Sequence, residues 1–223
     1  WQGSWSGGGT ITANGEAAGI FNMNPYDSPG NDGFDVEILD GSDLIMTDAI
    51  TMSAWLYPQM TGSHTGNPFS MVGDNNEWSM EVGTTVKCGG YMYLDGDLRR
   101  FSGDTALTRD AWSHVMITYS ESSEVAQVYV NGIIQGMDNQ IPGGLGSYAL
   151  PGTSGTLVIS GWNVARGSSQ AWKGRMADMR VYDSVLTSGN AVTLASINPA
   201  IDVSGNYADS ANTLGAVAWW KLN

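Results

Sequence analysis

The sequence predicts an all-β protein, an antiparallel sandwich of two sheets or jelly roll, with one short helix. Two observations predict it. Apolar residues recur at every second position in short runs, while helical periodicity is nearly absent. Clusters of Gly, Asp, Asn and Ser separate these runs, as turns separate strands. The pattern continues without a break in composition, which favours one sandwich domain over residues 1–223.

Residues 1–120 hold four alternating runs. Each run places apolar side chains on one face of a strand and polar or aromatic side chains on the other. We expect these strands at residues 52–57, 78–82, 91–94 and 115–119. Pro58 ends the first run, because proline donates no ladder hydrogen bond.

The clearest hairpin pattern lies in the second half of the chain. Asn131-Gly132 predicts a tight turn, because both residues tolerate positive φ. It joins a strand at 125–130 to a returning strand at 133–135. The remaining elements that we expect are a loop at 136–155, strands at 157–160 and 176–182, and one helix at 187–196.

Composition excludes several classes of function. The chain carries 22 acidic and 9 basic side chains, for a formal net charge of −13. Nucleic acids and anionic lipid surfaces are bound by clustered Lys and Arg, so neither is an expected partner. No apolar run approaches the roughly 18 residues of a membrane span, so we expect no membrane insertion. Cys88 is the single cysteine, which excludes an intrachain disulfide.

The ends of the sequence suggest a processed chain or a piece of a longer one. The chain begins at Trp1 rather than Met, and it ends in the strand-like stretch Val-Ala-Trp-Trp-Lys-Leu-Asn, residues 217–223. That stretch either closes a sheet of this domain, begins a following copy, or pairs with a neighbouring subunit by strand addition. The sequence therefore leaves open which sheet or chain the terminal strands at residues 1–20 and 204–223 join.

Three segments resemble laminin-G-like, concanavalin A-like jelly rolls, the lectin and glucanase domains related to pentraxins. The first is Ile-Thr-Met-Ser-Ala-Trp-Leu-Tyr-Pro at 50–58. The second combines Ala-Trp-Ser-His-Val at 111–115 with Val-Tyr-Val-Asn-Gly at 128–132. The third combines Leu-Val-Ile-Ser-Gly at 157–161 with the segment 172–183, Trp-Lys-Gly-Arg-Met-Ala-Asp-Met-Arg-Val-Tyr-Asp, and with Leu186.

The resemblance implies two curved antiparallel sheets packed face to face. It also implies that Trp55, Trp112 and Trp172 pack in the core. Relatives mostly bind glycans or proteins, often with calcium at a rim of the sandwich.

Catalysis is not expected, although the same fold occurs in β-glucanases. Those enzymes carry a Glu-x-Asp-x-(x)-Glu strand, and this chain has none. Glu77 and Glu81 share a strand face with Ser79 between them, and we interpret them as solvated strand residues. Ser113 and His114 are adjacent and so point to opposite faces. We therefore assign no catalytic residue, a structural role to His114, and an inert thiol to Cys88.

Calcium is the one cofactor that the sequence suggests, in a structural role. Residues 27–35 concentrate three Asp and one Asn around two Gly, and calcium takes oxygen ligands of this kind. The candidate ligands are Asp27, Asn31, Asp32 and Asp35. An ordinary acidic surface turn explains the same composition. Asp178 matches a recurrent aspartate of the family, and we favour a structural role for it over a calcium ligand.

Sugar binding requires an exposed aromatic ring beside planar polar groups. Trp162, Asn163 and Arg166 form the most sugar-like cluster, on a loop that follows a strand. An exposed edge or an assembly contact is the alternative interpretation. The tyrosines Tyr57, Tyr91 and Tyr93 line a concave sheet or fill a second layer.

Three functional hypotheses follow. The first is a non-catalytic module of an extracellular, cell-surface or virion-surface protein that binds a glycan or a surface protein. The second is a structural assembly module of a fibre, filament or capsid decoration, joined as a homo-oligomer or as tandem copies through edge strands. The third is a glucanase-type glycoside hydrolase.

Overall fold

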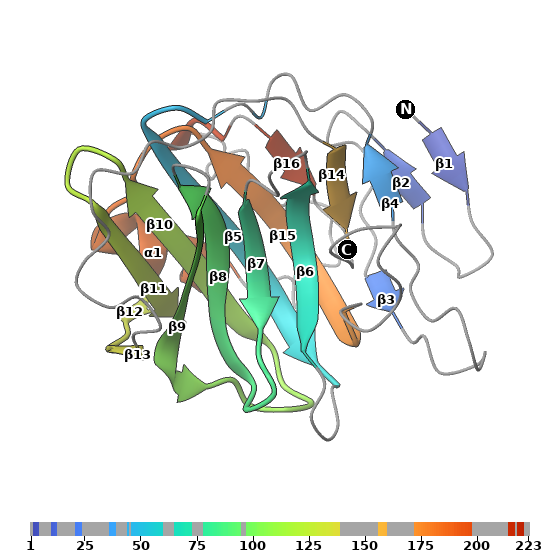
Figure 1. Ribbon diagram of the computed structural model, residues 1–223. Helices are drawn as coiled ribbons and strands as arrows, with labels where there is room; N and C mark the ends of the chain where they lie inside the picture. Colours follow the sequence, from blue (N-terminus) through green and yellow to red (C-terminus); the bar gives the residue numbers. More distant parts are fainter. Residues whose placement is uncertain are drawn as a thin grey trace.

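The structure of the protein is a computed structural model, shown as a ribbon in Figure 1. It describes residues 2–4, 10–12, 21–23, 36–38, 44, 46–59, 65–72, 78–94, 97–138, 156–159, 172–197, 214–216 and 218–220. Within these ranges the chain forms two seven-stranded sheets packed face to face and one helix. The predicted antiparallel sandwich is therefore confirmed.

Sheet I has the strand order β12-β11-β10-β5-β15-β16, and β3 pairs with β15 beyond that path. The strands are β3 (Phe21–Met23), β5 (Ala49–Pro58), β10 (Ser113–Ser120), β11 (Val125–Val130), β12 (Ile133–Ile134), β15 (Gly174–Tyr182) and β16 (Ala218–Trp220).

Sheet II has the order β13-β9-β8-β7-β6-β14-β4. Its strands are β4 (Val36–Ile38), β6 (Gly66–Val72), β7 (Trp78–Val82), β8 (Lys87–Leu94), β9 (Asp97–Ala106), β13 (Met137–Asp138) and β14 (Thr156–Ile159). β1 (Gln2–Ser4) and β2 (Thr10–Thr12) form a separate antiparallel pair. The sequence did not predict β3, β4, β6 or β9, and β13 lies inside a segment interpreted as loop.

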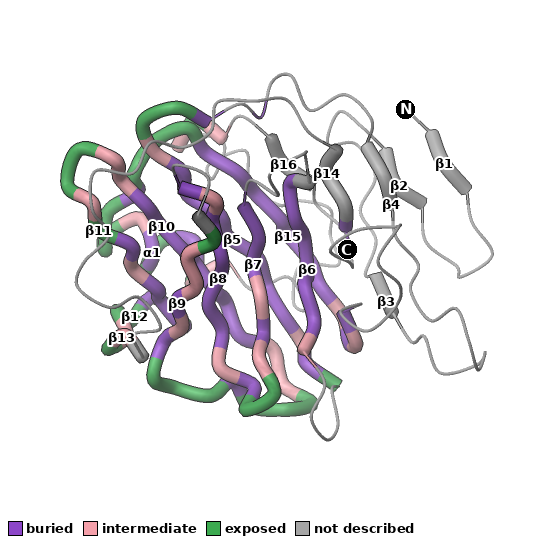
Figure 2. Tube along the Cα trace, viewed as in Figure 1, coloured by how far each residue is buried: buried purple, intermediate pink, exposed green. Residues whose placement is uncertain are grey.

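The core lies between the two sheets and follows from the alternation of each strand. In β5, Met52, Ala54 and Leu56 are fully buried in the core cluster, and Trp78 of β7 is 2% exposed within the same cluster. Figure 2 shows this burial along the central strands of both sheets. Each fully buried large apolar side chain contributes about 1.5–3 kcal/mol, so these strands hold the sandwich together.

The predicted hairpin turn is present between β11 and β12. Asn131 and Gly132 both have positive φ, 51° and 78°, as a type I′ turn requires. The Oδ1 atom of Asn131 accepts a hydrogen bond of 2.9 Å from the backbone N–H of His114. A Cβ atom on Gly132 would lie 2.9 Å from the Cα of Val192, so the turn also needs glycine for close packing against the helix.

The helix α1 (Ser188–Ser196) covers part of the outer face of sheet I. Thr187 caps it, accepting a hydrogen bond from the backbone N–H of Asn190 in a capping box. Ala191 and Leu194 are buried against a cluster from the sheet, which includes Met116, Tyr129 and Tyr182. Val192, by contrast, is 59% exposed, so the apolar side of the helix is narrower than its sequence suggests.

The remaining outer face of sheet I buries polar groups. Asp178 sits at a bulge in β15 with a φ of 52°, and its carboxylate lies 2.7 Å from the guanidinium of Arg180. Both side chains are buried, so Asp178 holds an ion pair, in agreement with the structural role. His114 lies nearby against the ring of Trp55, and burial together with Arg180 lowers its pKa to about 3.

The three tryptophans assigned to the core do not share one environment. Trp55 and Trp172 are buried, the latter at 0% exposure. Trp112 is only half-buried, because it precedes β10 at the end of sheet I rather than facing the core. The prediction that all three indoles lie in the core is therefore wrong for Trp112, and Trp55 is buried on the outer face of sheet I rather than between the sheets.

The C-terminal stretch closes sheet I. β16 pairs antiparallel with β15, and Trp219 lies opposite Arg180 in the register. Of the three arrangements that the sequence allowed, the structure shows the one within the same sheet.

We predict that Arg180→Leu lowers the free energy of unfolding by about 3–5 kcal/mol, because it leaves the buried Asp178 carboxylate without its cation. The double variant Asp178→Asn/Arg180→Leu recovers part of the loss, since asparagine tolerates positive φ without a charge. Urea unfolding of both variants measures this. A double variant less stable than Arg180→Leu alone would contradict the assignment.

Candidate functional site

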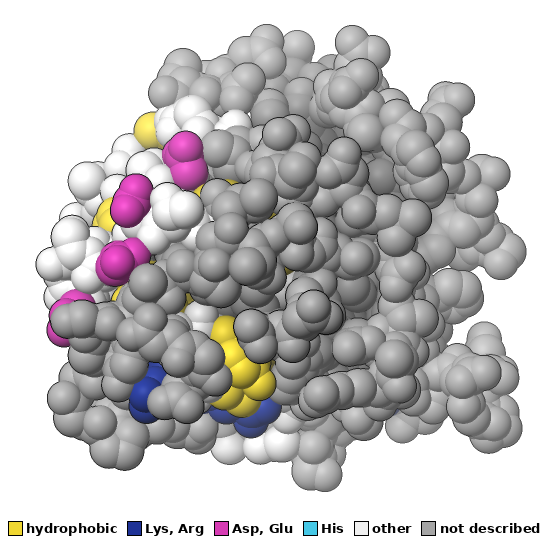
Figure 3. Space-filling view, turned by 45° about the horizontal axis from the view of Figure 1, so that its top comes forward, with side chains coloured by type: hydrophobic (Ala, Val, Ile, Leu, Met, Phe, Trp, Pro, Cys, Tyr) yellow, Lys and Arg dark blue, Asp and Glu magenta, His cyan; other side chains and the backbone are white. Residues whose placement is uncertain are grey.

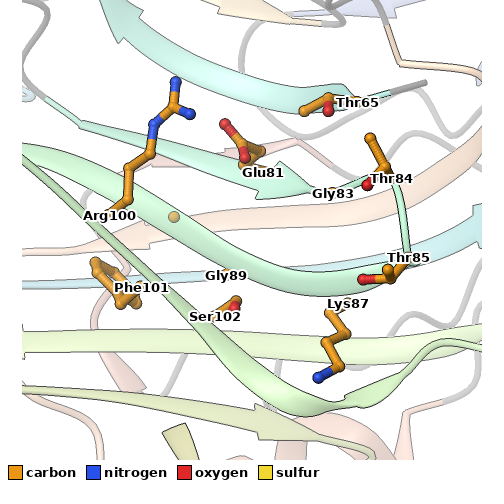
Figure 4. A pocket seen from close by; sticks show the side chains of 11 residues that line it. Thr65, Glu81, Gly83, Thr84, Thr85, Lys87, Gly89, Arg100, Phe101 and Ser102 are labelled. Carbon is orange, nitrogen blue, oxygen red and sulfur yellow. The ribbon is translucent and has the colours of Figure 1, made fainter. Parts of the chain in front are cut away.

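A pocket of about 240 Å³ opens on the outer face of sheet II. Strands β7, β8 and β9 supply most of its walls, and the turn between β7 and β8 supplies its rim (Figure 4). The lining residues are Thr65, Glu81, Gly83, Thr84, Thr85, Lys87, Gly89, Gly90, Arg100, Phe101 and Ser102.

The pocket lies over a pair of consecutive glycines in β8. Gly89 lies between Glu81 of β7 and Ser102 of β9 in the register, and it presents no side chain between them. A Cβ atom on Gly89 would come within 1.9 Å of the backbone oxygen of Phe101. A Cβ atom on Gly90 would lie 2.5 Å from the backbone oxygen of Ser79 and 3.6 Å from Ile117, on the core side. Close approach of the neighbouring strands therefore demands glycine at both positions, and Gly89 leaves the hollow on the outer face.

Glu81 is the acidic group of the pocket. Its side chain is half-buried, and burial raises the pKa of its carboxyl, an effect that the positive charge of Arg100 partly offsets. Figure 4 shows the Glu81 carboxyl and the Arg100 guanidinium on the same side of Gly89, with Ser102 and Lys87 on the other. Glu81 therefore faces the pocket in a poorly solvated setting, rather than standing as the solvated residue that we expected.

A buried polar layer lies beside the pocket. The ring of Tyr91 lies 5.9 Å from the Arg100 guanidinium carbon, within cation–π range. Ser70 and Ser79 hydrogen-bond to each other through their hydroxyls at 3.0 Å. Burial raises the pKa of Tyr91, whose hydroxyl interacts with these two serines. Tyr91 thus links this buried layer to Arg100 of the pocket.

The pocket offers polar recognition of a small group. Its volume lies below the roughly 300–1,000 Å³ of drug-sized sites. Hydroxyls, a carboxyl, an ammonium and a guanidinium together provide donors and acceptors, and the one aromatic ring among its lining residues, Phe101, is buried. Groups of this kind hydrogen-bond to hydroxyls or to charged atoms.

The residues that line this pocket do not include the pair of carboxyl groups that glycosidases use. Glycosidases use two carboxyl groups, and Glu81 is the one carboxyl among the residues lining this pocket. His114 is buried on the other sheet. Cys88 is buried in the core, where burial raises the pKa of its thiol.

The structure does not test the sugar and metal residues proposed from the sequence. Trp162, Asn163 and Arg166 lie outside the described residues, as do Asp27, Asn31, Asp32, Asp35 and Glu77. Within the described ranges, no group of three or more His, Cys, Asp or Glu side chains is placed to hold a metal ion. No helix in the same part of the chain has the length and apolarity to cross a membrane.

This pocket was not predicted from the sequence. Glu81 was expected on a strand as a solvated residue, and Arg100 and Ser102 lie on the unpredicted strand β9. The Gly89-Gly90 pair was the available indication, because glycine inside a strand marks a close backbone approach. Of the three tyrosines, Tyr91 lies on sheet II beside the pocket, and Tyr57 lies on sheet I.

Comparison with known proteins places the fold. A laminin G-type model, described as the concanavalin A-like lectin/glucanases superfamily, matches residues 30–190. No curated protein sequence matches the chain. Among solved structures, the heptameric SAP-like pentraxin from Limulus polyphemus aligns with a TM-score of 0.57 and 20% identity, over 80% of this chain and 82% of that one.

Two further structures are binding domains. The CBM40 domain of Ruminococcus gnavus IT-sialidase, bound to α2,3 sialyllactose, aligns with a TM-score of 0.52 and 11% identity over 72% of this chain and 96% of that one. The binding domain of botulinum neurotoxin DC, in complex with rat synaptotagmin II, aligns with a TM-score of 0.57 and 14% identity over 89% of this chain. The match covers 49% of that neurotoxin chain, about half its length. At these identities the likeness shows a shared fold.

We predict that the Glu81 carboxyl titrates above its ordinary value of 4.5 and that Arg100→Gln raises its pKa further. The reason is that Arg100 stabilises the charged carboxylate while burial opposes it. Carbon-detected NMR titration of the glutamate side chains measures both values. An unchanged or lower Glu81 pKa in Arg100→Gln would show that the two groups do not interact.

Proposed function

Because the chain belongs to the concanavalin A-like lectin and glucanase superfamily, we propose that it is a non-catalytic module that binds a glycan through the pocket on sheet II. The observation that carries the proposal is the polar hollow over Gly89 and Gly90, flanked by Glu81, Arg100 and Ser102. The pocket carries one carboxyl among its lining residues, which suits binding better than hydrolysis.

The chemistry of the pocket matches that of a sugar residue. Each sugar hydroxyl both donates and accepts hydrogen bonds, so a carboxylate and a guanidinium side by side engage it with fixed geometry. Domains of the same fold support a binding role, since one was solved with sialyllactose and another with the protein synaptotagmin II. A surface protein is therefore the second partner class within this proposal. The loop cluster of Trp162, Asn163 and Arg166 remains a proposed additional contact.

The proposal places the protein outside the cell, on a cell surface or on a virion surface. Its support is the likeness to a sialidase domain and a neurotoxin binding domain. It treats residues 1–223 as one domain.

A structural assembly module is the second candidate. The observation in its favour is the edge of sheet I at β12, where Ile133 is 68% exposed and Ile134 is 52% exposed. Consecutive exposed isoleucines at a sheet edge are typical of contact surfaces between chains or copies.

We predict that a glycan array identifies a ligand and that Glu81→Gln weakens its binding about tenfold or more, because hydrogen bonds to charged groups contribute about 1.5–3 kcal/mol. Glu121→Gln, a matched change on the turn before β11, leaves binding unchanged. Isothermal titration measures both variants.

Two outcomes would argue against the glycan pocket. An array without signal, together with ordered self-association in sedimentation, would favour the assembly module. Sugar release by the wild-type chain that survives Glu81→Gln would show a catalytic group elsewhere in the protein.

We predict that a calcium chelator lowers the melting temperature, with Asp27, Asn31, Asp32 and Asp35 as the ligands. Calcium at a hundredfold its dissociation constant adds about 2.7 kcal/mol to the free energy of unfolding. Asp32→Asn should abolish the effect of the chelator, which differential scanning calorimetry detects. A melting temperature that ignores both calcium and chelator would remove the metal from the proposal.

A further inference from the structure

A row of three side chains crosses the outer face of sheet I, on the side of the molecule opposite the pocket. Arg175 of β15 lies directly opposite Tyr57 of β5 in the register. On the other side of β5, Leu56 pairs with Ser113, which brings Trp112 beside Tyr57. The Arg175 guanidinium carbon lies 5.1 Å from the centre of the Tyr57 ring, and the Tyr57 and Trp112 ring centres are 5.5 Å apart at 63°.

The row lies at the boundary between the buried part and the exposed part of the outer face of sheet I. One position further along the outer face, Trp55, His114 and Ala177 are buried at 6%, 0% and 0% exposure. Tyr57, Trp112 and Arg175 are each only half-buried. Figure 1 shows the end of β5 beside the start of β15, and α1 lies over the far part of the sheet. The row is thus accessible, and it lies outside the hydrophobic core.

Arg175 lies against the ring of Tyr57. The carbon of its guanidinium is 5.1 Å from the ring centre, within cation–π range. Among the described residues, the Arg175 side chain makes no ion pair or hydrogen bond. Gly174 has a φ of 145°, and a Cβ atom there would lie 2.1 Å from the backbone oxygen of Tyr57. This glycine keeps β15 close to β5 at the position of the row.

Positive charge gathers around the row in an otherwise acidic chain. Lys173 accepts a backbone hydrogen bond of 2.9 Å from Gln59, and Asp110 donates one of 3.0 Å to Pro58, which places both segments beside the end of β5. Arg109, Lys173 and Arg175 are three of the nine basic residues of the chain, against the single acid Asp110 in these segments. On the face shown in Figure 3, the described acidic side chains lie apart from the basic ones.

We propose that this row is a second binding site, and that it takes an acidic sugar residue of a glycan, one that carries a carboxylate. A guanidinium matches a carboxylate with two parallel hydrogen bonds. The half-exposed rings of Trp112 and Tyr57 provide an apolar surface for the C–H face of the sugar ring. The surrounding cations favour an anion over a neutral sugar. The site lies on the other sheet from the Glu81 pocket, so it does not depend on the function proposed for that pocket.

The experiment screens the full chain against an array of sialylated and uronic acid-containing glycans with their neutral parent glycans, and then titrates the best acidic glycan. Arg175→Gln should weaken its binding about tenfold or more, because the lost hydrogen bonds are charge-assisted. Arg175→Lys should recover only a small part, since lysine keeps the charge without the planar fork. Trp112→Phe should weaken binding less than Arg175→Gln.

Two controls separate this site from simple charge and from the pocket. Arg99→Gln removes the same charge from β9 of sheet II, away from the row, and should leave the affinity unchanged. Glu81→Gln should leave the affinity unchanged, so a failure of the pocket and a failure of this row are distinguishable. Melting temperatures verify that each variant is folded.

The proposal is overturned if no acidic glycan binds, or if the acidic glycan binds equally well to wild type and Arg175→Gln. It is also overturned if its neutral parent binds as tightly as the acidic glycan. A poly-glutamate peptide that requires Arg175 while every acidic glycan fails would assign the row to a protein partner instead.

Discussion

The structure depends on β5 being covered on both of its faces. Its alternate residues Met52, Ala54 and Leu56 enter the core, while Thr51, Ser53 and Trp55 are buried on the other side. When a strand is buried on a single face, simple alternation of apolar and polar residues is sufficient. Because both faces of β5 are buried, its polar side chains also need hydrogen-bond or charge partners. The buried ion pair of Asp178 and Arg180 lies within this outer face, and the helix α1 covers another part of it.

The outer faces of the two sheets carry different chemistry. Sheet II has a hollow over Gly89, which carries no side chain and which the neighbouring strand approaches closely. Sheet I instead has a short row of two rings and a guanidinium at the point where its cover ends. The first surface offers hydrogen bonds in a confined space, and the second offers two inclined aromatic rings beside a cation. The two proposed sites therefore differ in the ligand chemistry that they suit.

The same backbone constraint recurs at both surfaces. A glycine brings two strands together at each, since added Cβ atoms would meet backbone oxygen at Gly89 and at Gly174. In β8 the result is a depression between flanking side chains. In β15 the result is an arginine placed directly over the tyrosine of the next strand. Glycine acts here by permitting close approach, and the functional groups come from the neighbouring strands.

The strands with clear alternation, the Asn131-Gly132 hairpin, the short helix and the family could be predicted from the sequence, because these features depend on neighbours along the chain. Neither the pocket nor the row could be predicted in this way. β9 reads as Asp-Leu-Arg-Arg-Phe-Ser-Gly-Asp-Thr-Ala, without the alternation of a half-buried strand, so Arg100 and Ser102 had no assigned neighbours. Trp112 was expected in the core, and Glu81 was expected in solvent. These positions became clear only from the fold, because the register between strands far apart in sequence sets which side chains meet across a sheet and which of them remain exposed.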